Sequence, residues 1–129
     1  YVDLVRALQE AKIELHYMVN VTGHGWRKLM RANRDDLAYI IEQVPEYPAE
    51  FEFIKEKANA SVEEMYGNFN MGVGFAIYVP EKYAEQVVEI ASSVNLKAWD
   101  AGHVVADEKA VRIKPLDIEF KSDSLGVRG

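Results

Sequence analysis

The sequence predicts an α/β domain in which helices pack against a mixed sheet. Strand and helix patterns alternate in the first half of the chain, and an apolar run at Val73–Val79 has the length of a buried strand. The last third instead shows short alternating segments that are typical of antiparallel strands. With 129 residues and 49% hydrophobic content, the chain is long enough for one domain with a real core.

The first part of the chain has the pattern of a helix, a strand and a glycine turn. Apolar residues recur at helical spacing over residues 2–11, and Ile13–Val21 alternates with the period of a strand that has one buried face. A second helix is expected to begin near Trp26. The apolar run Leu37–Ile41 is expected to be a strand, because prolines follow it.

The middle of the chain predicts two short helices and a strand. Phe51, Ile54 and Ala58 fit one helical face, and Ser61 with Glu64 forms a capping box that starts the next helix. The capping role makes Glu63 and Glu64 an exposed helix start, so they are assigned no chemistry. Val73–Val79 ends at Pro80 and is expected to be a central strand covered on both faces.

The last third predicts one helix followed by short strands. Apolar residues over 83–94 follow helical steps, and Asn95 can end that helix. Lys97–Val105 and Ala110–Ile113 flank Asp107–Lys109, which indicates a hairpin.

The final strand and the ends of the domain follow from the same reasoning. Leu116, Ile118 and Phe120 alternate as a last strand, and residues 122–129 are expected to form a loose tail. We therefore expect one domain over residues 1–121. Since the sequence opens on Tyr1 inside a predicted helix, we expect further chain before it.

Composition argues against several classes of partner. The formal net charge is −6 and the sequence pI is about 5.1, so no basic face is available for a nucleic acid. No apolar run reaches the roughly 18 residues needed to span a bilayer, so no membrane partner and a cytoplasmic protein are expected. The absence of cysteine excludes disulfides, thiolate metal sites and cysteine nucleophiles.

Asn20–Gly25, with the sequence N-V-T-G-H-G, is the first candidate site. Gly23 and Gly25 can take positive φ and let a ligand approach the backbone, while the segment from Trp26 offers the unpaired N–H groups of a helix start. Such a glycine turn before a helix is suited to binding a phosphate group. The alternative is a turn that only connects two elements.

A second stretch, Glu64–Gly74, carries the sequence E-M-Y-G-N-F-N-M-G-V-G, and Ala98–Gly102 reads A-W-D-A-G. The order and spacing of these two stretches and Asn20–Gly25 resemble the C-terminal domain of aminoimidazole ribonucleotide synthetase, also called phosphoribosylformylglycinamidine cyclo-ligase. The resemblance runs from Tyr1 to about Val105. It implies an α/β domain of that type, whose family places it behind a separate N-terminal domain.

The resemblance also implies a reaction. In that family, ATP phosphorylates the formyl oxygen of formylglycinamidine ribonucleotide, an amine attacks that carbon, and phosphate leaves as the imidazole ring closes. The family's ATP and Mg²⁺ contacts come largely from the N-terminal ATP-binding domain and from the partner in a homodimer. The segment that normally opens this domain, its first strand and helix, has no counterpart here.

The resemblance assigns substrate contacts to two sets of residues, one for each loop. They are Asn20, Thr22, Gly23 and Gly25 in the first and Asn70, Gly72 and Gly74 in the second. An amide can both donate and accept, and glycines let the backbone approach a ligand. The alternatives are a plain turn for the first set and a side-chain helix cap for Asn70.

Two positions depart from the family's usual H-I-T-G-G-G. Asn20 replaces the histidine and His24 replaces the middle glycine. An imidazole at His24 could contact phosphate or act as a catalytic acid, since it titrates near neutral pH; the alternative is a solvated surface histidine.

Other candidates carry less chemistry. Trp99 is expected to be a packing anchor, and Trp26 either lines the pocket or belongs to the core. A basic cluster could draw a phosphorylated substrate to the turn, although solvated charges are the alternative. Its members are Arg27, Lys28, Arg31 and Arg34. His16 and His103 lie far from any acidic ligand pattern, so no metal site is predicted.

Three functions compete. The first is a fragment of the cyclo-ligase that supplies the substrate-phosphate side of the site and is inactive alone, because nothing here resembles an ATP-binding loop. The second is a non-catalytic module that binds a phosphorylated ligand or a partner chain. The third is a related enzyme such as thiamine monophosphate kinase or selenophosphate synthetase, which the Met65-Tyr66 and Phe69-Asn70 pairs argue against.

Overall fold

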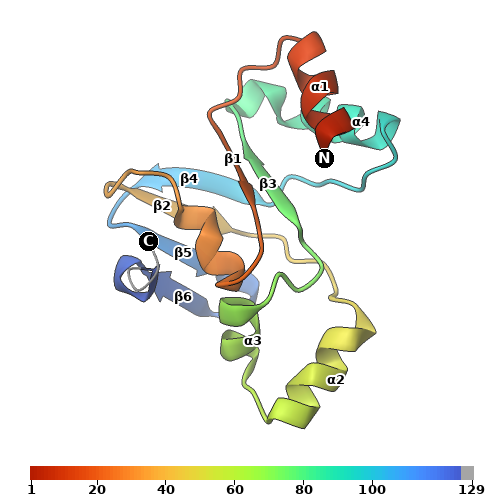
Figure 1. Ribbon diagram of the computed structural model, residues 1–129. Helices are drawn as coiled ribbons and strands as arrows, with labels where there is room; N and C mark the ends of the chain where they lie inside the picture. The colour runs from red at the N-terminus through yellow and green to blue at the C-terminus, as the bar shows by residue number, and fades with distance from the viewer. Residues whose placement is uncertain (126–129) are drawn as a thin grey trace. The chain divides into compact units, whose positions relative to one another are not determined.

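The structure is a computed structural model that describes residues 1–125 (Figure 1). The chain divides into two compact units. The helical unit comprises Tyr1–Met18 and Ile77–Asp100, and the sheet unit comprises Val19–Ala76 and the chain from Ala101 onward. The predicted fold class is confirmed, since strands form a mixed sheet and helices accompany them.

In the helical unit, α1 (Val2–Glu10) contacts α4 (Ala84–Ser93), which follows the 3₁₀ turn η2 (Glu81–Tyr83). Each helix buries residues four apart, Leu4 with Leu8 and Val87 with Ala91, as helical spacing predicts. The prediction for Asn95 is also confirmed. This residue takes the left-handed conformation with φ 63°, and the next N–H, of Leu96, bonds to Ala91 O at 2.9 Å.

Strands β1 (Tyr17–Asn20) and β3 (Phe75–Tyr78) pair with each other. Hydrogen bonds from His16 N to Tyr78 O and from Val21 N to Gly74 O show that they run antiparallel. The prediction of a central strand at 73–79 is wrong: among the described residues β3 pairs with β1 alone, and all four of its residues are half-buried. An apolar run indicates burial but does not say how many strands flank it.

The sheet unit contains a four-stranded sheet in the order β4-β2-β5-β6. Its strands are β2 (Leu37–Ile41), β4 (Gly102–Ala106), β5 (Ala110–Ile113) and β6 (Ile118–Lys121). β2 runs antiparallel to β4 and parallel to β5, while β5 and β6 are antiparallel. This is the mixed sheet that the alternating patterns predicted.

The predicted hairpin across Asp107–Lys109 is wrong. β2 lies between β4 and β5, so that Tyr39 has Val104 on one side and Val111 on the other. The short connection instead closes over the start of β2, where Asp107 N bonds to Asp36 O at 3.1 Å. The reason is burial: four consecutive residues of β2 are buried, and a strand inside the core needs backbone partners on both edges.

Short helices complete the sheet unit. The helix expected near Trp26 is the 3₁₀ helix η1 (Gly25–Met30), which contacts β2, β5 and α3. The others are α2 (Ala49–Ala58), α3 (Val62–Asn68), η3 (Lys114–Leu116) and η4 (Ser122–Leu125). The expected tail therefore begins with a 3₁₀ turn, and its residues 126–129 lie outside the described part of the chain.

The predicted capping box at Ser61 is present. Ser61 Oγ accepts from Glu64 N at 3.1 Å, and Glu64 Oε1 accepts from Ser61 N at 3.0 Å. Ser61→Ala should lower the free energy of unfolding by about 1 kcal/mol, because the Glu64 N–H loses its acceptor. Urea unfolding checks this, with exposed Ser92→Ala as the control; equal stability of Ser61→Ala and the parent chain would contradict it.

The same box makes stability depend on pH. The bond from Ser61 N lowers the pKa of Glu64 below its ordinary value. The stabilisation by Glu64 is therefore present above the ordinary glutamate pKa and is lost as the pH falls through the lowered value of the folded state.

Candidate functional site

The structure brings the two predicted loops together. We call residues 20–25 the first loop and residues 70–74 the second loop; both belong to the sheet unit. Val21 N bonds to Gly74 O at 3.0 Å, and Trp26 Nε1 donates to Asn70 O at 2.9 Å. Every residue that the sequence assigned to substrate contact therefore lies on one of two adjoining loops.

The two predicted glycines of the first loop have different surroundings. Gly25 is buried with φ 52°, and a Cβ there would lie 2.3 Å from Tyr66 O and 2.7 Å from Phe69 O. It lets the loop pack against the end of α3 and does not face solvent. Gly23 is exposed, and a Cβ there would meet nothing within 4 Å, so the surface above it is open.

The predicted helix start is weaker than the sequence suggested. η1 is a six-residue 3₁₀ helix, and two of its first N–H groups already have partners: Gly25 N bonds to Thr22 O at 2.9 Å and Arg27 N to His24 O at 3.2 Å. His24 takes φ 73° and is half-buried, while Thr22 and Asn20 are exposed. Ligand contacts at this loop therefore rest mainly on side chains.

The second loop is a tight turn stabilised by Asn70. Its backbone carbonyl accepts from Val73 N at 2.9 Å, and its Oδ1 accepts from Gly72 N at 2.9 Å. Met71 and Gly72 both have positive φ, of 51° and 92°. Asn70 thus holds the turn after α3, and its amide NH₂ group has no hydrogen bond among the described residues.

Met71 is a strained residue in this turn. Met71 is 2% exposed, yet it takes a left-handed conformation that is unfavourable for a long side chain. Burial of the side chain and the bonds made by Asn70 hold it there. The conformation of the second loop is therefore stabilised by contacts within the protein itself.

Trp26 belongs to the core. It is 3% exposed and meets Tyr66 edge to face, with ring centroids 4.9 Å apart. Tyr66 is also buried, which raises the pKa of its phenol. Because the Trp26 Nε1–H reaches the second loop from η1, this side chain joins the two loops from beneath.

The members of the basic cluster make different contacts. Arg27 Nη1 donates to Gly67 O at 2.9 Å, and its guanidinium lies 5.2 Å from the centre of the Phe120 ring. Arg34 makes two bonds to Asp36, at 2.9 and 3.0 Å, which lower the pKa of that carboxyl. Neither arginine points to the first loop.

Lys28 differs from these arginines. Its Nζ donates to Thr22 Oγ1 at 3.0 Å and so reaches the first loop directly. Sequence reasoning included Lys28 only as one member of a cluster; its position six residues after Thr22 could have singled it out only if η1 had been known to fold back along the loop.

Two open hollows lie in the sheet unit, and neither is lined by a residue of the first or second loop. One, of 440 Å³, is lined by Arg27, Glu63, Glu64, Glu119, Phe120, Lys121 and Asp123. The other, of 460 Å³, is lined by Val44, Pro45, Glu46, Tyr47, Glu52, Tyr66, Pro115 and Leu116. The candidate site, formed by the first and second loops, is separate from both hollows.

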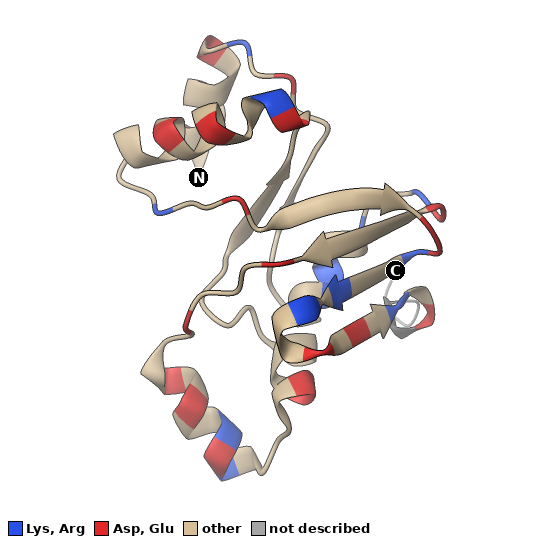
Figure 2. Cartoon of the chain, turned by 180° about the vertical axis from the view of Figure 1, so that it is seen from behind, with Lys and Arg blue, Asp and Glu red and all other residues tan. Residues whose placement is uncertain are grey.

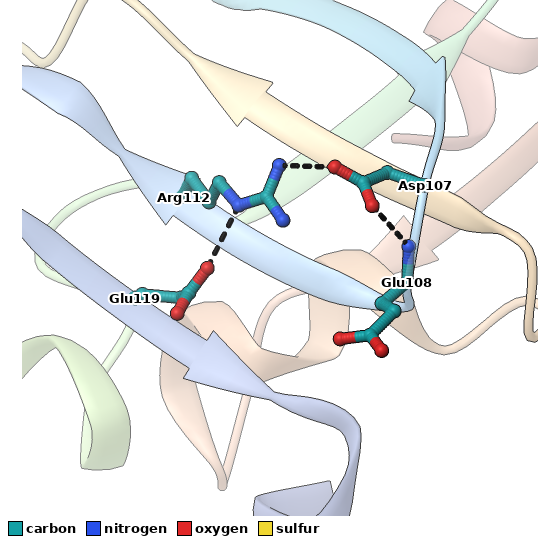
Figure 3. A network of polar contacts seen from close by, with 4 residues as sticks. All are labelled: Asp107, Glu108, Arg112 and Glu119. Carbon is teal, nitrogen blue, oxygen red and sulfur yellow. Dashed lines mark hydrogen bonds and ion pairs between the residues drawn. The ribbon is translucent and has the colours of Figure 1, made fainter.

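A second set of polar groups connects strands of the four-stranded sheet. Arg112 on β5 bonds to Asp107 at 3.0 Å and to Glu119 on β6 at 2.7 Å, which ties two strands and a connection together (Figure 3). The bond to Glu119 and then that to Asp107 raise the pKa of Arg112. Such an exposed network contributes little to the free energy of folding and carries no chemistry here.

Charge and metal-binding groups are scattered. Figure 2 shows acidic and basic residues interspersed along α2. Within residues 1–125, no three histidine or acidic side chains are arranged to hold a metal ion. Over the same residues, no helix combines the length and apolar character needed to cross a bilayer.

Gly102, the last residue of the third motif A-W-D-A-G, allows two strands to lie close together. A Cβ on Gly102 would lie 1.8 Å from Ile40 O, so only glycine allows β4 to approach β2 at that point. Trp99 is half-buried within the helical unit.

Comparison with known proteins decides the family. The model of the family described as AIR synthase related protein, C-terminal domain, matches residues 2–114. The chain belongs to this family. Among its relatives, a phosphoribosylformylglycinamidine cyclo-ligase of Methanococcus vannielii is 34% identical over 114 residues, which is 88% of this chain and 31% of the relative. One of the same name from Methanopyrus kandleri is 43% identical over 91 residues, 70% of this chain and 26% of the relative.

The fold also has a match among solved structures. The crystal structure of the protein tt0281 from Thermus thermophilus matches with a TM-score of 0.55 and 22% identity, over 86% of this chain and 34% of that one, which supports the fold alone. The chain spans between 26% and 33% of the length of the curated relatives it matches.

Proposed function

We propose that this chain is part of an ATP-dependent cyclo-ligase of purine biosynthesis that converts formylglycinamidine ribonucleotide to aminoimidazole ribonucleotide. The observation that carries the proposal is the junction of the two motif loops through Trp26 and Asn70, in a chain whose relatives bear the name of that enzyme. In this proposal the chain supplies the side of the site that binds the substrate phosphate.

The residues around the loops suit that task. Thr22 offers a hydroxyl, Gly23 leaves the surface open, and Asn70 holds its turn with Oδ1 while its NH₂ group remains to donate. Catalysis on such a surface is positioning and charge stabilisation by groups fixed in advance. Asn20 and His24 border the same surface and complete the proposed contacts, with His24 as the group that could move a proton.

ATP and Mg²⁺ are assigned elsewhere in the parent enzyme. In the family that the sequence resembles, the ATP and Mg²⁺ contacts come largely from the N-terminal domain and the dimer partner, and nothing in this sequence resembles an ATP-binding loop. We therefore place that site mainly in an N-terminal ATP-binding domain and its homodimer partner, and expect residues 1–129 alone to be inactive. The proposed pathway places the enzyme in the cytoplasm.

The direct test is ADP release driven by formylglycinamidine ribonucleotide in the intact protein that contains these residues. Turnover would support the cyclo-ligase and show that Asn20 and His24 are compatible with it. A folded protein that binds the ribonucleotide without turnover would favour a non-catalytic binding module. A protein that neither binds nor converts it would contradict the proposal.

Asn70→Ala should weaken ribonucleotide binding about tenfold, because it removes both the amide donor and the acceptor that holds Gly72 N–H. Calorimetric titration measures the affinity, and circular dichroism checks the fold.

Asn70→Asp is the companion variant, since a carboxylate keeps the acceptor for Gly72 N–H, loses the donor and adds a negative charge that should weaken phosphate binding further. An unchanged affinity for the aspartate variant would show that the NH₂ group makes no contact with the ligand.

A further inference from the structure

We propose that Lys28 is the cation that holds the phosphate group at the first loop, together with the hydroxyl of Thr22. The inference rests on the proposed function and names the ligand chemistry of that site, a phosphate monoester of a sugar. Lys28 lies outside both sequence motifs, and its assignment comes from the bond between its Nζ and Thr22 Oγ1.

That bond leaves donors on both partners. An ammonium group has three protons, and Lys28 directs one of them to Thr22 at 3.0 Å. Because the Thr22 oxygen accepts this proton, its own O–H is free to donate outward. Two donors side by side, one of them charged, match two oxygens of a phosphate group.

Lys28 is not neutralised by the protein. Within residues 1–125 it makes no bond to a carboxylate, whereas Arg34 is paired with Asp36 and Arg27 is held by Gly67 O above the Phe120 ring. In a chain with a formal net charge of −6, an unpaired cation beside a hydroxyl is a local site for an anion.

The surface beside Lys28 has room for a ligand. Gly23 follows Thr22, is exposed, and has open space where a side chain would begin. A phosphate there can approach the ammonium and the hydroxyl without moving the backbone. Gly25, buried two residues later, fixes the loop against α3 and so keeps Thr22 in place.

The test is calorimetric titration of the intact protein with ribose 5-phosphate, with ribose as the blank. Lys28→Met should weaken binding of ribose 5-phosphate tenfold or more, since a charged hydrogen bond is lost. Arg34→Met removes the same charge from the same segment, but its side chain is turned to Asp36, so its affinity should stay within about twofold of the parent protein. Lys28→Arg should keep most of the affinity.

Three outcomes would overturn the assignment: no binding of ribose 5-phosphate by the parent protein, an affinity of Lys28→Met equal to that of the parent, or an equal loss in Arg34→Met. The last would indicate net charge and not a specific contact.

The inference and the proposed function can fail separately. Turnover of formylglycinamidine ribonucleotide with an unchanged KM in Lys28→Met would retain the cyclo-ligase and reject Lys28 as the phosphate cation. Binding of ribose 5-phosphate that depends on Lys28, without turnover of the ribonucleotide, would do the reverse.

Discussion

Gly25→Ala is expected to lower the free energy of unfolding of the sheet unit by about 3 kcal/mol or more. A left-handed conformation costs a residue with a Cβ about 1–2 kcal/mol, and overpacking of a filled site costs about 1–3 kcal/mol. Both apply here, because φ is 52° and the new methyl group would lie 2.3 Å from Tyr66 O and 2.9 Å from Phe69 N. These are backbone atoms at the end of α3, which cannot turn aside as a side chain could.

Gly23→Ala is the matched control. It places the same methyl group two residues earlier in the same loop, where nothing lies within 4 Å. Its unfolding free energy should stay within about 0.5 kcal/mol of the parent chain. Urea unfolding followed by tryptophan fluorescence measures both variants, and equal losses in the two would refute the packing role of Gly25.

Trp26→Ala is expected to be the most disruptive change of a side chain near the site. Removing a large buried aromatic residue costs about 3–5 kcal/mol, and Trp26 is 3% exposed against Tyr66. It also weakens the junction of the loops, because the bond from Trp26 Nε1 to Asn70 O is lost while that from Val21 N to Gly74 O remains. Ribonucleotide affinity should therefore fall together with stability.

Trp26→Phe separates these two effects. A six-membered aromatic ring remains, while the five-membered ring and its Nε1–H are lost and Asn70 O keeps its bond from Val73 N. The cost should be about 1 kcal/mol, close to that of one hydrogen bond. Thermal unfolding and calorimetric titration are the measurements; a phenylalanine variant as unstable as the alanine variant would assign the role to the indole shape and not to its N–H.

Local patterns predicted the elements of this chain well. The capping box at Ser61, the apolar run of β2 and the left-handed Asn95 after α4 each depend on a few neighbouring residues, and the structure confirms all three. Such features follow from backbone geometry and hydrogen bonding within one turn or one strand.

Pairing between distant segments could not be predicted in the same way. Nothing in Ala38–Ile41 says that β4 will lie on one side and β5 on the other, and a three-residue connection after Ala106 is equally suited to a hairpin. The apolar run that contains β3 was taken for a central strand for the same reason. Burial is encoded in residue type, whereas the partner strand is not.

The candidate site also combines features that the sequence could predict with features that it could not. The motifs singled out the two loops as candidate sites but did not predict their contact, which the structure places at Val21 and Gly74. Which atoms face outward depends on neighbours far along the chain. Gly25 is buried by Tyr66 and Phe69, and Arg27 is drawn away by Gly67, so neither is available at the surface of the loop.

The position of β2 between β4 and β5 sets the order in which the sheet can form during synthesis. β2 leaves the ribosome well before β4 and β5 have been synthesised. Both edges of β2 therefore stay unpaired until these strands, which follow α4 in the chain, are made. Until β5 emerges, the buried residues Ala38–Ile41 remain an open apolar segment. The four-stranded sheet can therefore pair only late in synthesis, and the long sequence separation of its paired strands favours slow folding.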